Sequence, residues 1–266
     1  TLIVHCAAKV GDWGPVEEYR EVNVRGLEAL LEVARATGKL RRFVHISSLG
    51  VYEARDHHGT DESEPTHSTG IDGYTLSKVE SEQLVLEHVA EHDLPAVVLR
   101  PGFIYGPRDR TVLPRLLDRL QAGAVKYLGS GEQLMNNTYV GNLVDAIWLA
   151  VDHDEALGEV FNITDGTLVT KRDFIGGIAR LAGLPEPTGS VPLGVARFLA
   201  SVMEGTWRLL RKSEAPLLSS ARIKFLGLNL DYSIGKARRE LGYDPAVSFE
   251  EGMAETIEWC RETGLV

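Results

Sequence analysis

The chain has 266 residues, of which 44% are hydrophobic and 25% are charged, and its formal net charge is −10. This length suffices for one large domain, or for a large and a small one. The acidic balance argues against nonspecific nucleic-acid binding, which requires clustered cations. No apolar run approaches the roughly 18 residues of a membrane span. Cys6 and Cys260 have no metal-like spacing, so the sequence predicts a reduced, cytoplasmic setting and no metal site.

Short apolar runs alternate with long amphipathic segments in the first hundred residues. Strands are predicted at residues 2–8, 43–47 and 96–99, and helices at residues 16–37 and 73–92. Nearly all-apolar strands are typical of parallel sheets that are covered on both faces. The alternation therefore predicts an α/β protein with a doubly wound parallel sheet and right-handed crossovers.

After Pro101 the pattern changes to shorter, mixed elements. The last predicted helix begins with Ser248 and Glu251 in the spacing of a capping box. Helices are predicted over residues 112–122, 143–151, 171–181 and 249–262, and Gly129-Ser130-Gly131 is predicted to be a turn.

The run from Tyr74 to Lys78, with Ser48 upstream, predicts a proton-transfer site. Tyr74 and Lys78 stand at i and i+4 on one helical face, so an ammonium can lie near the phenol and favour its ionised form. The spacing alone is common on protein surfaces. Ser48, however, follows a predicted strand, and ligands of such sheets bind beyond the carboxyl ends of the strands. Serine, tyrosine and lysine are therefore expected to converge over one edge of the sheet.

Five segments, taken in order, resemble the extended short-chain dehydrogenase/reductases, which form the NAD-dependent epimerase/dehydratase superfamily. The resemblance implies a Rossmann-like sheet in residues 1–108, a partial dinucleotide-binding domain whose N-terminal βα units are missing. It also implies a smaller, mostly helical substrate domain in residues 109–266, with some elements returning to the sheet. The segments are His5-Cys6-Ala7-Ala8, Asn23-Val24-Arg25-Gly26, Ser47 to Tyr52, Tyr74 to Lys78 and Arg100-Pro101-Gly102.

The same resemblance implies roles for individual residues. Tyr74 would be the acid/base, Ser48 would hold the substrate oxygen, and Lys78 would bind the nicotinamide ribose and lower the Tyr74 pKa. Phe103 and Arg108 would face the substrate. For Arg108, a surface ion pair is an equally good interpretation. Cofactor contacts are implied for Ala7, Ala8, Asn23, Ser47, Tyr74, Lys78, Pro101 and Ile104.

The second half is similar to the branch of 3β-hydroxysteroid and sterol-4-carboxylate dehydrogenases. Nucleotide-sugar epimerases more often carry an aspartate pair where Gly141-Asn142 stands. This favours an NAD-dependent oxidoreductase, with NADP not excluded, that acts on a secondary alcohol or ketone of a hydrophobic, steroid-like molecule. A nucleotide-sugar epimerase or dehydratase stays as the alternative.

The glycine-rich turn that binds pyrophosphate in this family does not precede Thr1, and the chain begins at what resembles the family's fourth strand. We therefore expect weak dinucleotide affinity, and a truncated, inactive binding protein is a third alternative. A homodimer through residues 16–37 and 73–92 is implied by the resemblance only.

Three other features favour plainer interpretations. His57, His58 and His67 are predicted to lie in a solvated loop, because their spacing is not that of a metal site. Cys6 is predicted to be a small buried side chain. Residues 192–212 form an amphipathic segment, predicted to be a core-packed or substrate-covering helix, with peripheral membrane contact as the alternative.

Overall fold

A computed structural model describes residues 1–67 and 72–266. Its centre is a parallel sheet of four strands, in the order β1, β2, β4, β9. The predicted α/β fold with a parallel sheet is confirmed. The strands span Leu2–His5 (β1), Arg42–Ile46 (β2), Ala96–Pro101 (β4) and Val160–Ile163 (β9).

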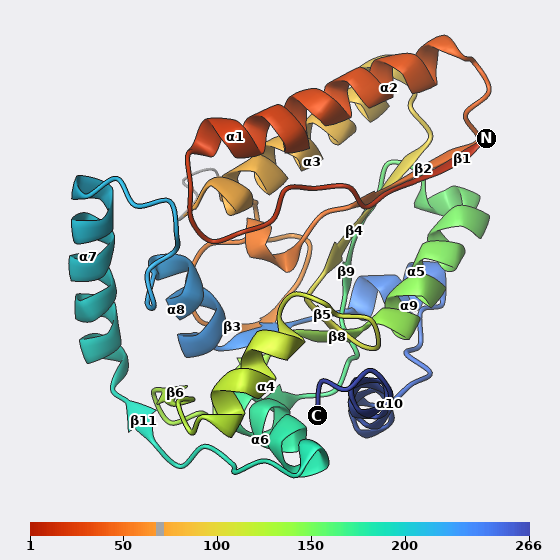
Figure 1. Cartoon of the computed structure of the whole chain (residues 1–266). Coiled ribbons are helices and arrows are strands. Elements are labelled where there is room, and N and C mark those ends of the chain that lie inside the picture. The colour runs from red at the N-terminus through yellow and green to blue at the C-terminus, as the bar shows by residue number, and fades with distance from the viewer. Residues whose placement is uncertain (68–71) are drawn as a thin grey trace.

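Helices cover both faces of this sheet (Figure 1). On one face lie α1 (Val16–Arg20), α2 (Gly26–Ala36) and α3 (Gly73–His92). A π-helical turn, Glu21–Arg25, joins α1 to α2, so the predicted helix over residues 16–37 is one continuous helical segment with a π turn inside it. On the other face lie α5 (Val140–Asp152) and α9 (Gly235–Leu241).

Successive side chains of the central strands pack alternately into two hydrophobic cores, one on each face of the sheet. Phe43 and Val98 pack with Leu31 under the first helical layer, whereas Val44 and Leu99 pack under the second. This is the period-two alternation of a strand that is buried on both faces. The apolar runs at β2 and β4 therefore have the burial that the sequence predicts.

The first strand departs from that expectation. β1 pairs only with β2 in the described part of the chain, so it is an edge strand, and its Leu2 and Val4 side chains are 39% and 37% exposed. The strand ends at His5, and Cys6 lies in the loop beyond it, exposed. The prediction of a buried Cys6 is wrong, because its side chain lies in the loop beyond β1 and is exposed within residues 1–67 and 72–266.

The remaining strands in the described residues form short two-stranded sheets outside the central sheet. They are β3 (His57–Thr60) with β12 (Leu230–Tyr232), β5 (Phe103–Tyr105) with β8 (Asn137–Tyr139), β7 (Leu134–Met135) with β10 (Val169–Thr170), and β6 (Tyr127–Leu128) with β11 (Ser190–Val191). The turn at Gly129-Ser130-Gly131 is confirmed, with φ of +76° and +84° at its two glycines.

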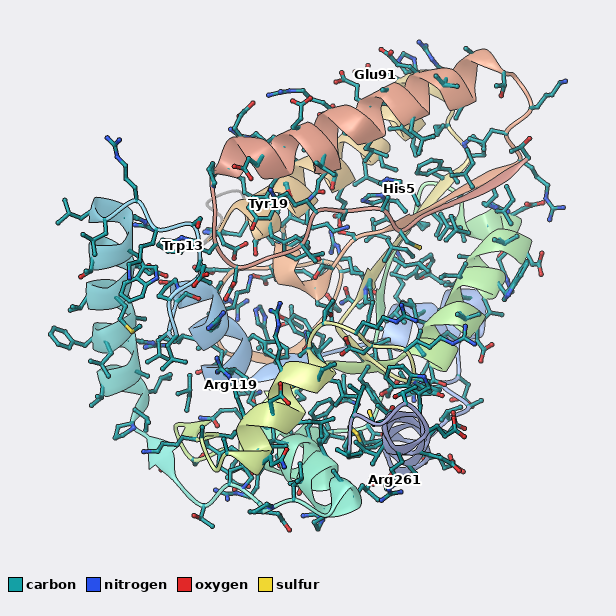
Figure 2. All side chains as sticks on the ribbon, viewed as in Figure 1. His5, Trp13, Tyr19, Glu91, Arg119 and Arg261 are labelled. Atoms are coloured by element: carbon teal, nitrogen blue, oxygen red, sulfur yellow. The ribbon has the colours of Figure 1, made fainter. Side chains whose placement is uncertain are left out.

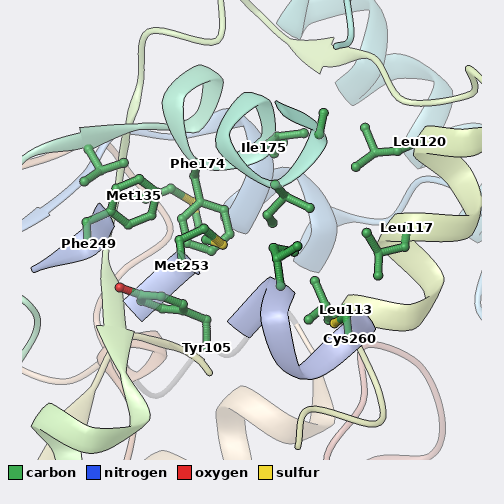
Figure 3. Close-up of a cluster of buried hydrophobic side chains, with 14 of the residues drawn as sticks. Tyr105, Leu113, Leu117, Leu120, Met135, Phe174, Ile175, Phe249, Met253 and Cys260 are labelled. Carbon is green, nitrogen blue, oxygen red and sulfur yellow. The ribbon is translucent and has the colours of Figure 1, made fainter. Parts of the chain in front are cut away.

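The C-terminal half is mostly helical, and its own core lies between α4, α6 and α10 (Figure 3). The rings of Tyr105, Phe174 and Phe249 meet there at centroid distances of 5.5 to 6.0 Å. Ser248 and Glu251 form the predicted capping box of α10. The helices are α4 (Leu113–Gln121), α6 (Lys171–Ala182), α7 (Leu193–Leu209), α8 (Ser220–Gly227) and α10 (Phe249–Glu262), and 3₁₀ turns occur at Leu49–Val51 and Asp154–Ala156.

His57 is not in a solvated loop. It is fully buried in β3, where Nδ1 bonds with Thr60 Oγ1 at 3.0 Å and Nε2 bonds with Glu53 O at 2.9 Å. The prediction fails because β3 pairs with β12, some 170 residues later, which covers the ring with Tyr232. His58 and His67 are exposed.

No group of three or more His, Cys, Asp or Glu side chains in residues 1–67 and 72–266 is arranged to hold a metal ion. None of the helices in these residues has the length and hydropathy needed to cross a membrane.

Candidate active site

The predicted catalytic residues Ser48 and Tyr74 are neighbours beyond the carboxyl end of β2, and Lys78 reaches the last residue of that strand. Ser48 follows β2 directly and is the N-cap of the 3₁₀ turn Leu49–Val51. Tyr74 lies in the first turn of α3, which Asp72 caps by accepting a hydrogen bond from Thr75 N at 2.7 Å. The Ser48 side chain lies near the phenol of Tyr74 and acts to lower its pKa. The serine and the tyrosine are thus neighbours in the folded chain.

Close packing fixes the start of α3. Tyr19 of α1, labelled in Figure 2, is 1% exposed and lies against Gly73, where a Cβ would come within 2.6 Å of its ring. The Tyr19 hydroxyl donates to Trp13 O at 2.8 Å. Glycine is therefore needed immediately before Tyr74 so that α1 can approach the helix.

Lys78 lies one turn beyond Tyr74 and is 5% exposed. Its Nζ donates to Ile46 O, on β2, at 2.7 Å, and this is its one hydrogen bond within the described residues. Burial lowers the pKa of Lys78 to about 8, against the opposing effects of Cys6 and Glu82. An ammonium has three donors, so two remain for a ligand.

The expected lowering of the Tyr74 pKa does not occur in the chain alone. Burial, and secondarily the Asp72 carboxylate, raise the pKa of Tyr74 to about 12, while the Ser48 side chain acts in the opposite direction. That expectation was wrong because the Lys78 ammonium is directed at the carbonyl of Ile46. The phenol is consequently protonated at neutral pH.

Asn23, a predicted cofactor contact, joins two walls of the site. It lies in the π turn and is 2% exposed. Its Oδ1 accepts from Lys9 N at 2.6 Å, and its Nδ2 donates to Lys9 O at 3.0 Å and to Ser77 Oγ at 2.8 Å. Ser77 Oγ in turn donates to Tyr74 O at 2.8 Å. The amide is therefore used to position the loop after β1 against α3.

Ser47, a second predicted cofactor contact, belongs to a buried network. Its Oγ donates to Glu82 Oε2 at 2.6 Å. Glu82 in turn forms a salt bridge with Arg100, and the side chains of Glu82 and Arg100 are 1% and 6% exposed. Arg100 Nη1 donates to Tyr52 OH at 2.7 Å. The Ser47 hydroxyl is thus occupied within the protein.

The network continues to β9, because Tyr52 OH donates to Asn162 Oδ1 at 2.9 Å. Sequence reasoning missed Glu82 as a member of it. A signal was present, because Glu82 follows Lys78 by four residues on the helical face that meets the sheet, where an unpaired charge would be costly.

The other predicted contacts are placed at the rim or in the packing around the site. Ala7 is exposed and Ala8 half-buried in the loop after β1, and Ile104 is 41% exposed. Pro101 is buried at the end of β4. Phe103 packs against Phe174 and Phe225 at centroid distances of 5.7 and 4.9 Å, and Arg108 is exposed with a φ of +73°.

The Asn142 side chain, on which the preference for a hydrophobic substrate was based, is bonded entirely within the protein. It is fully buried, its Nδ2 donates to Asp165 Oδ1 and to Val247 O at 2.9 Å each, and its Oδ1 accepts from Val247 N at 3.0 Å. An aspartate here would place a second carboxylate against Asp165. The asparagine at position 142 is thus explained by its bonds to Asp165 and to the Val247 backbone in the C-terminal half.

Comparison with known proteins decides the family. Residues 1–164 match the model described as the NAD dependent epimerase/dehydratase family. The chain belongs to this family. It is an NAD-dependent dehydrogenase/reductase of the extended short-chain type, which confirms the resemblance at that level.

Two curated relatives and one solved structure illustrate the similarity. A 4-hydroxy-2-methyl-3-oxo-4-farnesyl-3,4-dihydroquinoline-1-oxide ketoreductase of Stigmatella aurantiaca is 32% identical over 95% of this chain and 75% of its own. A decarboxylating sterol-4-alpha-carboxylate 3-dehydrogenase of Candida albicans is 32% identical over 98% of this chain and 77% of its own. An epimerase of Methanothermobacter thermautotrophicus superposes with a TM-score of 0.77 at 25% identity, over 99% of this chain and 72% of its own.

The residues present fit the family's dinucleotide at its nicotinamide end. Small side chains from Cys6 to Ala8 leave the backbone beyond β1 open to close approach, with Cys6 and Ala7 exposed. The buried ammonium of Lys78 lies near Cys6 and has donors left for ribose hydroxyls.

Proposed function

We propose that the chain catalyses the NAD(P)-dependent interconversion of a secondary alcohol and a ketone on a hydrophobic substrate. The observation that carries the proposal is the placement of Ser48 beside Tyr74 just beyond β2, with the buried amine of Lys78 one helical turn along α3 and bonded to the last residue of β2. The proposed catalytic residues are these three. Ala7, Ala8 and Lys78 would hold the dinucleotide.

In the reductive direction the protonated phenol of Tyr74 is the general acid. Its high pKa keeps the proton available at neutral pH, for donation to the oxygen on which negative charge develops. Ser48 donates a hydrogen bond to the same oxygen, and this bond strengthens as the charge grows. NAD(P), when bound, supplies or accepts the hydride. Lys78 would donate its two remaining N–H groups to the ribose hydroxyls.

Aromatic packing beside the site supports an apolar substrate over a sugar nucleotide. Phe103 directly follows Gly102 at the end of β4 and packs on the ring of Phe225. The names of the two curated relatives refer to a farnesyl-bearing ketone and a sterol. The structural similarity to an epimerase keeps epimerisation as the second candidate.

A cofactor-oxidation assay separates the two candidates. We expect the chain to oxidise NADH or NADPH with a hydrophobic ketone, such as a 3-oxosteroid or a long-chain 3-oxoacyl compound, and to leave UDP-glucose unchanged. Epimerisation of UDP-glucose without net change in the cofactor, and no turnover of the apolar ketones, would contradict the proposal.

We further propose that α7 lies against an anionic membrane surface. Ala196 and Ala200 pack inward, and Glu204 is 14% exposed and turned to Ser220, whose N donates to it at 2.6 Å. The outward face is apolar and is bordered by cations, which complements anionic lipid. Its apolar members are Val195, Phe198, Val202 and Leu209, at 49%, 68%, 51% and 83% exposure, and its cations are Arg197, Arg208, Arg211 and Lys212.

Sedimentation with vesicles tests this contact. The protein should bind phosphatidylglycerol vesicles but not phosphatidylcholine vesicles, and Phe198→Ser with Leu209→Ser should abolish binding. Loss of a dimer in that variant, without vesicle binding by the parent, would instead assign the face to a second copy.

The division into two domains at residues 108/109 and the homodimer through α1, α2 and α3 stay as proposals.

A further inference from the structure

A lysine of the C-terminal half reaches the turn that carries Ser48. Lys224 lies in α8, and its Nζ donates to Gly50 O at 2.5 Å and to Tyr52 O at 3.0 Å. These carbonyls lie inside and at the end of the 3₁₀ turn Leu49–Val51, which begins at Ser48 and ends at Tyr52. One ammonium therefore connects two points of the turn across more than 170 positions of sequence.

Within the turn itself, two hydrogen bonds involve the serine. Ser48 Oγ accepts from Gly50 N at 3.0 Å, and Val51 N donates to Ser48 O at 3.2 Å. A single 3₁₀ turn has poor hydrogen-bond geometry and little stability of its own. The turn is also held by the fully buried side chains of Leu49 and Val51 and by the bond from His67 N to Val51 O at 2.8 Å. Lys224 adds charge-assisted bonds, which are stronger than neutral ones.

Neighbouring residues of α8 bind other parts of the site. Arg222 Nε pairs with Asp12 Oδ2, in the loop after β1, at 2.5 Å. Phe225 packs on Phe103 at a centroid distance of 4.9 Å. Burial lowers the pKa of Lys224 to about 8, and the Asp72 carboxylate before Tyr74 opposes this effect. The helix thus presents a partly desolvated cation to the catalytic turn.

We propose that Lys224 is a positioning residue, which fixes the turn after β2 so that the Ser48 hydroxyl points at Tyr74 and at the substrate oxygen. This rests on the proposed function. Displacement of a catalytic group by about 1 Å can cost roughly a hundredfold in rate, so Lys224→Met should lower kcat about ten- to hundredfold. KM should change much less, because the proposal gives Lys224 no contact with substrate.

Amide hydrogen exchange tests the restraint without any assay of activity. In the full chain, Lys224→Met should speed exchange at the amides of Gly50, Val51 and Tyr52 at least tenfold. The matched control is Lys236→Met, which removes another lysine that donates to a backbone carbonyl, Val160 O at 3.1 Å, and to Glu159. It should leave exchange in the turn and kcat unchanged.

A double-mutant cycle with Ser48→Ala tests the consequence for catalysis. If Lys224 acts through the serine, Lys224→Met should cost less than twofold in kcat once Ser48 is alanine. Additive losses, unchanged exchange in the turn, or faster exchange with an unchanged kcat would each overturn the role of Lys224. Full activity of Ser48→Ala itself would contradict the proposed function instead, while the exchange experiment would still report on the restraint.

Discussion

Replacing Lys78 with methionine should make the fold more stable at pH 7. The fall of the Lys78 pKa from 10.5 to about 8 corresponds to about 3 kcal/mol lost by burying the ammonium. Methionine removes this cost but also removes the hydrogen bond to Ile46 O, which lowers the stability of the variant by about 1 kcal/mol. The variant should therefore be about 2 kcal/mol more stable than the parent at pH 7.

The sign of the pH dependence follows from the lowered pKa. Below pH 8 both the folded and the unfolded chain carry the charge, and the full cost is present. Between about pH 8 and 10.5 the folded chain releases the proton first, so the stability of the parent rises with pH. The advantage of Lys78→Met should shrink to near zero at pH 10.

Urea unfolding of both proteins at pH 7 and pH 10 measures this difference. Lys236→Met is the control, because its amine is paired with Glu159, and it should lower stability by about 1 kcal/mol or less. A Lys78→Met variant that is less stable than the parent at pH 7, or a difference that is the same at both pH values, would refute the reasoning. Confirmation would mean that a buried lysine is kept at a cost in stability.

Two further substitutions test the frame of the site by urea unfolding. Glu82→Gln leaves the Arg100 guanidinium buried without its ion pair and should lower the free energy of unfolding by about 3 to 5 kcal/mol. The control, Glu186→Gln in the exposed pair with Arg180, should lower it by less than about 1 kcal/mol. Equal losses in the two variants would contradict this prediction. Gly102→Ala would place a Cβ 1.7 Å from Asn136 O and should cost about 3 kcal/mol or more, whereas Gly205→Ala in α7 meets nothing within 4 Å and should be neutral or stabilising. A tolerated Gly102→Ala would count against the close approach of β5 and β8.

Local patterns predicted much of the fold. The apolar runs of β2 and β4 and the periodicity of α3 and α10 are long enough to identify, and buried strands have few alternatives. The pairs β3 with β12 and β5 with β8 were not predictable. Strands of three or four residues carry no clear period, and their partners come from distant parts of the chain.

The candidate site shows the same division. Ser48, Tyr74 and Lys78 could be proposed from spacing and from their place after a strand. The hydrogen-bond partners could not, because Lys78 bonds to a backbone carbonyl and Lys224 reaches the serine turn from α8. The raised pKa of Tyr74 depends on burial and on Asp72, which spacing does not reveal.

The most direct test of the proposed chemistry is the turnover of Tyr74→Phe with NADH or NADPH and an apolar ketone. The variant loses the proton donor but keeps the ring that packs at the start of α3, so it should fold with unchanged stability. We expect kcat to fall by at least about a hundredfold, as for loss of a general acid. Near-parental turnover in the folded variant would contradict the assignment of Tyr74.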